Sequence, residues 1–115
     1  MTGGNIVLTP LPQADGQVKN RPALVLCRVR PFNDLMVCGI SSQWRLLVPD
    51  FDEIISPGDE DFEASGLKTQ SLIRLGYVST VPAAAIKGRV GSIGVLRHRR
   101  LVSRLVDHLG QAVKP

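Results

Sequence analysis

Residues 19–26 read Lys-Asn-Arg-Pro-Ala-Leu-Val-Leu and set two cations and a proline directly before a short, wholly apolar strand. Pro22 fixes its own φ at about −65° and favours extended geometry at the preceding residue, so it suits the start of a strand. The pattern predicts that Arg21 is restrained at the start of a strand, where it would attract an anionic ligand. By itself the pattern also fits a solvated surface arginine, so the surrounding residues must decide between the two.

Apolar runs separated by turn residues surround this stretch. We expect strands at residues 6–8, 23–29, 35–40 and 71–81, a short strand near 53–55, and an exposed loop at 13–20. Pro10 and Pro12 should end the first strand because proline removes hydrogen-bond donors, and Gly76 should mark a bulge in the last one. This pattern favours a small antiparallel barrel or sandwich over alternating strands and helices.

One helix is predicted at the C-terminus. An apolar stripe at helical spacing contains Leu101, Val102, Leu105, Val106 and Leu109, and Gly110 should be the C-cap. Arginines surround the start and the polar side of this helix, at positions 97, 99, 100 and 104. We interpret them as a solvated helix face, with ligand binding as the alternative.

The 115 residues, 43% of them hydrophobic, fit a single domain spanning 1–115. No apolar run approaches the roughly 20 residues that cross a bilayer, and the N-terminus lacks a secretory signal pattern, so we expect a cytoplasmic protein with no membrane association. Cys27 and Cys38 are predicted to be buried free thiols, with a disulfide as the alternative. Their spacing fits no metal site, so we expect no metal and no cofactor.

The net charge of +4 hides a strong asymmetry. Residues 50–63 contain seven of the ten acidic residues and no Lys or Arg, so this segment carries −7 and the rest of the chain +11. A strongly basic remainder suggests a polyanionic partner, because Lys and Arg supply most of the nonspecific affinity for nucleic acids. Solubility alone is the competing interpretation.

Taken in order, several short motifs resemble the MazF/PemK family of toxin-antitoxin ribonucleases over nearly the whole chain. They are Gly4-Asn5-Ile6-Val7, Arg21-Pro22 before an apolar strand, Ile40-Ser41-Ser42-Gln43, Ser71-Leu72-Ile73-Arg74, Thr80-Val81, and Gly91 before the final helix. The resemblance implies an SH3-like antiparallel barrel with a C-terminal helix, as in MazF, PemK and CcdB. It also implies a homodimer, a cognate antitoxin that blocks the RNA groove, and metal-independent cleavage of single-stranded RNA that leaves a cyclic phosphate and a 5′-hydroxyl.

The resemblance also assigns catalytic residues. Arg21 matches the arginine of the family's Arg-Pro motif, Ser41 stands where many members carry a threonine, and Arg74 matches an arginine that some members use as the acid. In the family an aspartate usually follows that arginine by two residues, but here the position holds Gly76. The general acid and the general base therefore stay unassigned.

The chemistry of these side chains indicates narrower roles. Arginine keeps its charge and can bond two phosphate oxygens, so Arg21 and Arg74 suit electrostatic stabilisation better than proton transfer. The Ser41 hydroxyl would position or stabilise the reacting groups, with Ser42 as the fallback because strand neighbours face opposite sides. A strand end that is capped by its own serine side chains is the structural alternative.

RNA binding is assigned to six residues near these three: Lys19, Asn20, Ser42, Gln43, Trp44 and Tyr77. Trp44 and Tyr77 are candidates for base stacking, although an aromatic side chain in so small a domain also fits the core or a dimer interface. Two other function classes stay open. One is a non-catalytic toxin of the same fold, such as a gyrase poison or an inactive homologue, and the other is a small basic RNA-binding module whose acidic loop only improves solubility.

Overall fold

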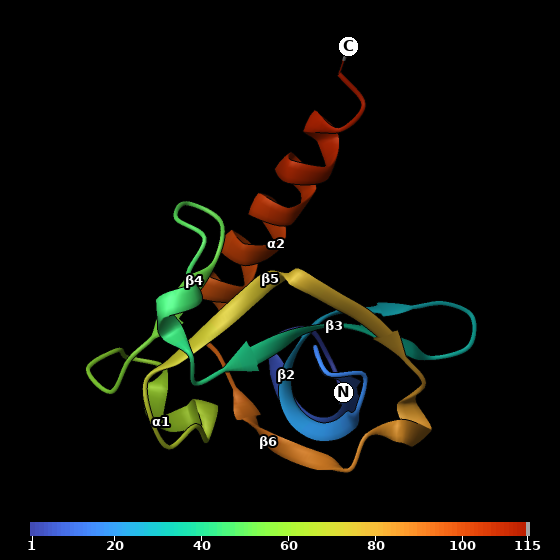
Figure 1. The fold of residues 1–115 in the computed structure, drawn as a ribbon, viewed down its shortest axis with the longest axis horizontal. Helices are drawn as coiled ribbons and strands as arrows, with labels where there is room; N and C mark the ends of the chain where they lie inside the picture. Colours follow the sequence, from blue (N-terminus) through green and yellow to red (C-terminus); the bar gives the residue numbers. More distant parts are fainter. Residues whose placement is uncertain (115) are drawn as a thin grey trace.

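The computed structural model describes residues 1–114, and its main feature is one curled antiparallel sheet of six strands (Figure 1). The strands lie side by side in the order β4-β5-β3-β2-β1-β6. Their bounds are β1 Asn5–Pro12, β2 Val18–Val29, β3 Asp34–Ser41, β4 Glu53–Ile55, β5 Ser71–Val81 and β6 Gly88–Ser92. The remaining elements are α1 Phe62–Ser65, α2 Val95–Gln111 and two 3-10 turns, η1 Trp44–Leu46 and η2 Ala83–Ala85. This half-barrel with a C-terminal helix confirms the predicted fold class.

The first hairpin is longer than the sequence predicted. Strand β1 continues through both prolines, with Pro10 opposite Asn20 and Pro12 opposite Val18, so the connecting loop shrinks to residues 13–17. The prediction that Pro10 ends the first strand is therefore wrong. Strand β6 pairs with β1 only as far as Leu8, so one edge of β1 is unpaired beyond that point, and proline is tolerated at such an edge.

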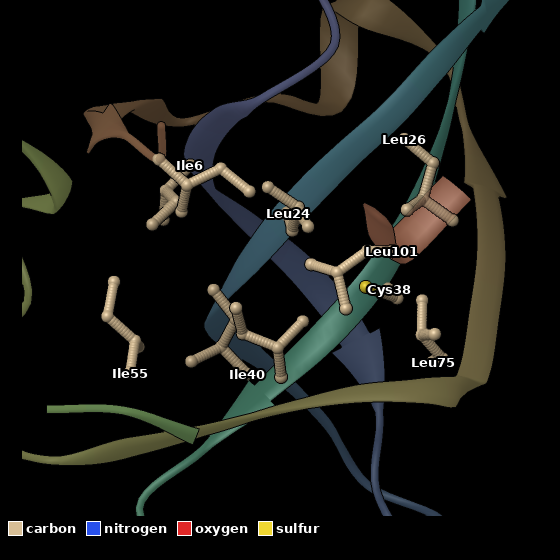
Figure 2. Close-up of a cluster of buried hydrophobic side chains, with 10 residues drawn as sticks. Ile6, Leu24, Leu26, Cys38, Ile40, Ile55, Leu75 and Leu101 are labelled. Atoms are coloured by element: carbon tan, nitrogen blue, oxygen red, sulfur yellow. The ribbon is translucent and has the colours of Figure 1, made fainter. Parts of the chain in front are cut away.

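Both faces of the sheet are buried. On one face, Leu101 of α2 packs among Leu24, Cys38 and Ile40 of the central strands (Figure 2). Inside the curl, a second cluster is built from the alternate residues of the same strands: Val7, Leu11, Ala23, Val25, Leu35, Val37 and Val81. Because successive strand residues face opposite sides, continuous apolar runs such as 35–40 supply both clusters.

Two elements had no clear sequence signal. Strand β6 has glycine at two of its five positions, and α1 is only four residues long. Where β6 meets the end of α1, Gly91 and Gly66 have no room for a side chain. A β-carbon on Gly91 would lie 2.3 Å from the carbonyl oxygen of Ala64, and one on Gly66, where φ is +72°, would lie 2.2 Å from that of Val90. The two glycines therefore allow α1 to pack closely against β6.

The C-terminal helix is confirmed, but its end differs from the prediction. Helix α2 includes Gly110 and is followed by Ala112 as its C-cap, so Gly110 is not the cap. Leu101 is fully buried, whereas Val106 and Leu109 of the same predicted stripe are 61% and 60% exposed. Figure 1 shows the reason, because the C-terminal part of α2 points away from the sheet.

Three of the helix arginines form ion pairs with the acidic segment. Arg97 contacts three carboxylates, with its Nη1, Nη2 and Nε atoms 2.9, 2.9 and 2.8 Å from oxygens of Glu53, Asp59 and Asp61 respectively. Arg100 and Arg104 also pair with Glu53, at 2.6 and 3.0 Å. The interpretation as a solvated face is therefore wrong for Arg97, whereas Arg99 is exposed and Arg100 stays 48% exposed while it pairs with Glu53. The acidic segment fastens β4 and the start of α1 to α2, which a purely solubilising loop would not do.

Both cysteines are free thiols, as predicted, but only one is buried. Cys38 lies in the core, whereas Cys27 is exposed. Strand β2 has a register shift between Val25 and Cys27, and Cys27 and Arg28 directly after the shift are exposed. The prediction of burial is therefore wrong for Cys27. Within residues 1–114, no helix is both long enough and apolar enough to span a membrane.

Candidate functional site

An open groove of about 670 Å³ lies where β3 ends beside β5 and the loop after β1. Its lining comes from four segments of the chain: Leu11 to Ala14, Arg21, Gly39 to Gln43 with Leu46, and Arg74 with Gly76 and Tyr77. Arg21, Ser41 and Arg74 therefore share one cavity, although they come from three different strands. The groove also contains three of the six residues assigned to RNA binding, namely Ser42, Gln43 and Tyr77.

Arg21 lies within β2 and not at its start. It pairs across the sheet with Thr9, and its side chain is exposed. The strand places it at the groove because β2 starts at Val18, three residues before it, and pairs there with Pro12. Gln13 and Ala14, in the turn between the two strands, line the same end of the groove.

The serine pair stands where β3 ends. Ser41 is the last residue of the strand, and its Oγ accepts a hydrogen bond of 3.0 Å from the backbone N–H of Gln43. This is the self-capping geometry that was the structural alternative for the pair. A hydroxyl that accepts one bond can still donate its proton, so Ser41 can also serve a ligand in the groove. Ser42 follows the strand, and it lines the groove as well.

The bulge that Gly76 predicted follows Arg74 and includes Tyr77. On β3 the neighbours Cys38 and Gly39 pair with Val78 and Arg74, so the three residues between them on β5 have no cross-strand partner. The guanidinium carbon of Arg74 lies 5.9 Å from the centroid of the Tyr77 ring. The bulge thus places an arginine and an aromatic ring together at the groove.

Asp52, which the sequence analysis did not identify, supports this bulge. Its side chain is buried, with 6% of the residue exposed. Oδ1 accepts a bond of 3.0 Å from the N–H of Leu75 in the bulge, and Oδ2 accepts one of 2.9 Å from the N–H of Val48. Asp52 therefore joins the bulge of β5 to the segment that follows η1. Its position within the run of acidic residues concealed this role.

Three predicted binding residues lie outside the groove lining. Lys19 and Asn20 are exposed at the start of β2. Trp44 is 40% exposed on η1, and the guanidinium carbon of Arg45 lies 5.1 Å from its ring centroid. Along the chain, all three are within two residues of a lining residue, Arg21 or Gln43.

The groove is electropositive. Its lining includes two arginines and no Asp, Glu or His within residues 1–114. Three residues of the acidic segment, Glu53, Asp59 and Asp61, pair with arginines of α2, and within residues 1–114 no ion pair joins an acidic residue to Arg21 or Arg74. No group of three or more His, Cys, Asp or Glu residues in the described chain could hold a metal ion. The arrangement suits a phosphate-bearing ligand, because guanidinium groups bond phosphate oxygens in pairs.

The sequence model of one protein family, the PemK-like, MazF-like toxins of type II toxin-antitoxin systems, matches residues 2–109. The chain therefore belongs to this family. A comparison with curated protein sequences finds no match.

Solved structures agree on the fold. The chain is similar to the Mycobacterium tuberculosis toxin MazF-mt6, with a TM-score of 0.66 and 18% identity over 92% of this chain and 96% of that one. It is also similar to an endoribonuclease in complex with its cognate antitoxin from Mycobacterial species, with a TM-score of 0.69 and 13% identity. That match covers 96% of this chain and 95% of the other.

Proposed function

We propose that this toxin is a metal-independent, sequence-selective endoribonuclease that cleaves single-stranded RNA. The observation that carries the proposal is the meeting of Arg21, Ser41 and Arg74 in one open groove that has no acidic lining residue in the described chain. Two arginines in a cavity of this size favour a phosphodiester, and an open groove admits an unpaired strand.

The reaction needs little from the protein because RNA carries its own nucleophile. The 2′-oxygen attacks the phosphorus, the bond to the 5′-oxygen breaks, and the products are a cyclic phosphate and a 5′-hydroxyl. Arg21 and Arg74 stabilise the extra negative charge of the phosphorane, and the Ser41 hydroxyl donates to one of its oxygens. Within residues 1–114 the lining offers no carboxylate or imidazole, so the protons pass between the RNA, solvent and the hydroxyl groups of the groove.

The proposal includes the assembly and the location of the protein. We take residues 1–115 as one toxin domain that acts in the cytoplasm as a homodimer and is inhibited by a cognate antitoxin. A homodimer is supported by apolar side chains of α2 that a single chain leaves uncovered, including Val95 at 73% and Leu96 at 70% exposure. Light scattering of the purified toxin measures its mass directly.

The decisive experiment is incubation of the pure protein with a long single-stranded RNA in EDTA, followed by sequencing of the fragment ends. Discrete cuts with 2′,3′-cyclic phosphate and 5′-hydroxyl ends are expected. Arg21→Ala should abolish them while circular dichroism stays unchanged. Arg28→Ala is the matched control, since Arg28 is an exposed arginine of the same strand outside the groove lining.

The same groove is compatible with one other function. A lining without a carboxylate or an imidazole also fits a non-catalytic toxin that acts by binding a protein. Absence of discrete cuts across several long RNAs would refute the endoribonuclease proposal. Trapping of cleaved supercoiled DNA by gyrase in the presence of the protein would then favour this other function.

A further inference from the structure

Arg74 has an unusual partner for a groove arginine. Within residues 1–114, no carboxylate lies within ion-pair distance of its guanidinium, whereas Arg97, Arg100 and Arg104 all bind acids. The Arg74 guanidinium instead lies over the Tyr77 ring, whose centroid is 5.9 Å from Cζ. That distance falls within the range of about 6 Å at which a cation is attracted to an aromatic face.

The position of the Tyr77 ring depends on Gly39, which lies across the sheet on β3. A β-carbon on Gly39 would lie 2.9 Å from Cδ2 of the ring and 3.5 Å from both Cγ and Cε2. Gly39 is buried, and it is absent from the glycines with positive φ, so its backbone conformation does not require glycine. The ring occupies the space that a side chain at position 39 would fill.

The register of the sheet explains why these three residues meet. Gly39 pairs directly with Arg74, so side chains at these two positions share one face of the sheet. Residues 75–77 form the bulge, which is held by the hydrogen bond from Leu75 to Asp52. Because of the bulge, Tyr77 lies on the same face of the sheet as Arg74. The missing side chain of Gly39 leaves room there for the Tyr77 ring.

We propose that Tyr77 is a positioning residue for Arg74, and that the missing side chain of Gly39 provides the space in which the Tyr77 ring is held. The proposal rests on the function proposed above. An aromatic face restrains a planar guanidinium without using its N–H groups, whereas a carboxylate partner would occupy two of them. Arg74 is thereby held in one orientation with its donors free for two phosphate oxygens.

Kinetics of RNA cleavage test this role. Tyr77→Phe keeps the ring and should keep kcat within about twofold, whereas Tyr77→Leu should lower kcat about tenfold with KM nearly unchanged. Gly39→Ala, which displaces the ring, should resemble Tyr77→Leu. A rise in KM at constant kcat would overturn the proposal, because it would show that the ring binds a base directly.

Double variants identify the group through which the ring acts. In an Arg74→Ala background, Tyr77→Leu should cause no further loss of activity, since the residue that it positions is already gone. In a Tyr77→Leu background, Gly39→Ala should likewise add nothing. A tenfold loss from Tyr77→Leu in both the native and the Arg74→Ala backgrounds would overturn the proposal.

A measurement on the free protein separates this proposal from the endoribonuclease proposal. The Tyr77 ring should shift the Arg74 side-chain proton resonances in NMR spectra through its ring current. The shift should persist in Tyr77→Phe and disappear in both Tyr77→Leu and Gly39→Ala. Arg74 resonances that are identical in the wild type and Tyr77→Leu would overturn the pairing, whatever the activity. A ring-current shift in a protein that cleaves no RNA would leave the pairing intact and refute the endoribonuclease.

Discussion

The Nε atom of Arg97 lies 2.8 Å from Oδ2 of Asp61, and the same carboxylate oxygen accepts a 2.9 Å bond from the backbone N–H of Gly94. Asp61 therefore ties together the start of α1, the residue before α2 and the first turn of α2. Only 12% of the Arg97 side chain and 14% of the Asp61 side chain are exposed. This pair fastens the acidic segment to the helix that contributes Leu101 to the larger core.

Arg97→Met should destabilise the fold by about 3 kcal/mol, because it leaves mostly buried carboxylates without their common partner. Urea unfolding followed by circular dichroism measures the loss. Arg99→Ala is the control, since Arg99 is an exposed arginine of the same helix, and it should change stability by less than about 0.5 kcal/mol. Equal effects of the two substitutions would contradict the assigned role of Arg97.

Stability should fall at acidic pH because of the same ion pairs. Burial opposes ionisation of Glu53 and Asp61, but hydrogen bonds and charges from Arg100 and Arg97 outweigh it and hold each pKa below its ordinary value of 4.5 or 3.8. The unfolded chain then binds more protons, so the stabilisation is complete above pH 4.5 and is lost as pH falls through the lowered pKa values. Melting temperatures between pH 6 and pH 2 should decline more steeply in the wild type than in Arg97→Met, and parallel curves would contradict this.

Asp52→Asn should damage both the fold and the groove. The two carboxylate oxygens of Asp52 each accept a backbone N–H, whereas an amide offers one acceptor and turns two donors toward the other N–H. We expect a loss of about 1–3 kcal/mol and a lower rate of RNA cleavage, because the bulge loses its support. Asp50→Asn serves as the control, since Asp50 is exposed. Cleavage at the wild-type rate would show that the bulge does not need Asp52.

The two thiols should differ sharply in reactivity. Burial, with a smaller contribution from the charge of Asp52, raises the pKa of Cys38 to about 12, so this thiol is protonated and shielded at neutral pH. Cys27 is exposed. A chromogenic disulfide reagent should therefore modify one thiol per chain in the native protein and two in guanidinium chloride. Rapid modification of both thiols in the native state would contradict the burial of Cys38.

Ser41→Ala should lower RNA cleavage about 100-fold if its hydroxyl stabilises the phosphorane, while Ser41→Thr should retain activity. The alanine variant also loses the bond to the N–H of Gln43, so a thermal melt must accompany the kinetics. Ser41→Thr restores both functions of the hydroxyl. Full activity of Ser41→Ala would limit Ser41 to capping the strand end.

Local patterns in the sequence were enough to predict several elements. The strand at 71–81 and the short strand at 53–55 occur with the predicted bounds, because β-branched and apolar residues there lie between turn residues. The helical stripe predicted α2 but not its end, since nothing local shows where a helix leaves the sheet. Pro10 suggested the end of a strand, because the sequence does not reveal which edge of β1 stays unpaired.

By itself, the sequence determined the mostly β architecture, the basic character of the chain outside 50–63, and the family to which it belongs. The tertiary structure alone decided that Arg21, Ser41 and Arg74 share a groove, because strand register sets such distances and register depends on pairings far apart in the chain. It also decided the partners of the charges: Arg97 meets carboxylates 36 to 44 residues away, while Arg74 meets the Tyr77 ring. Neither partner follows from spacing along the chain, since burial and the β5 bulge bring these side chains together.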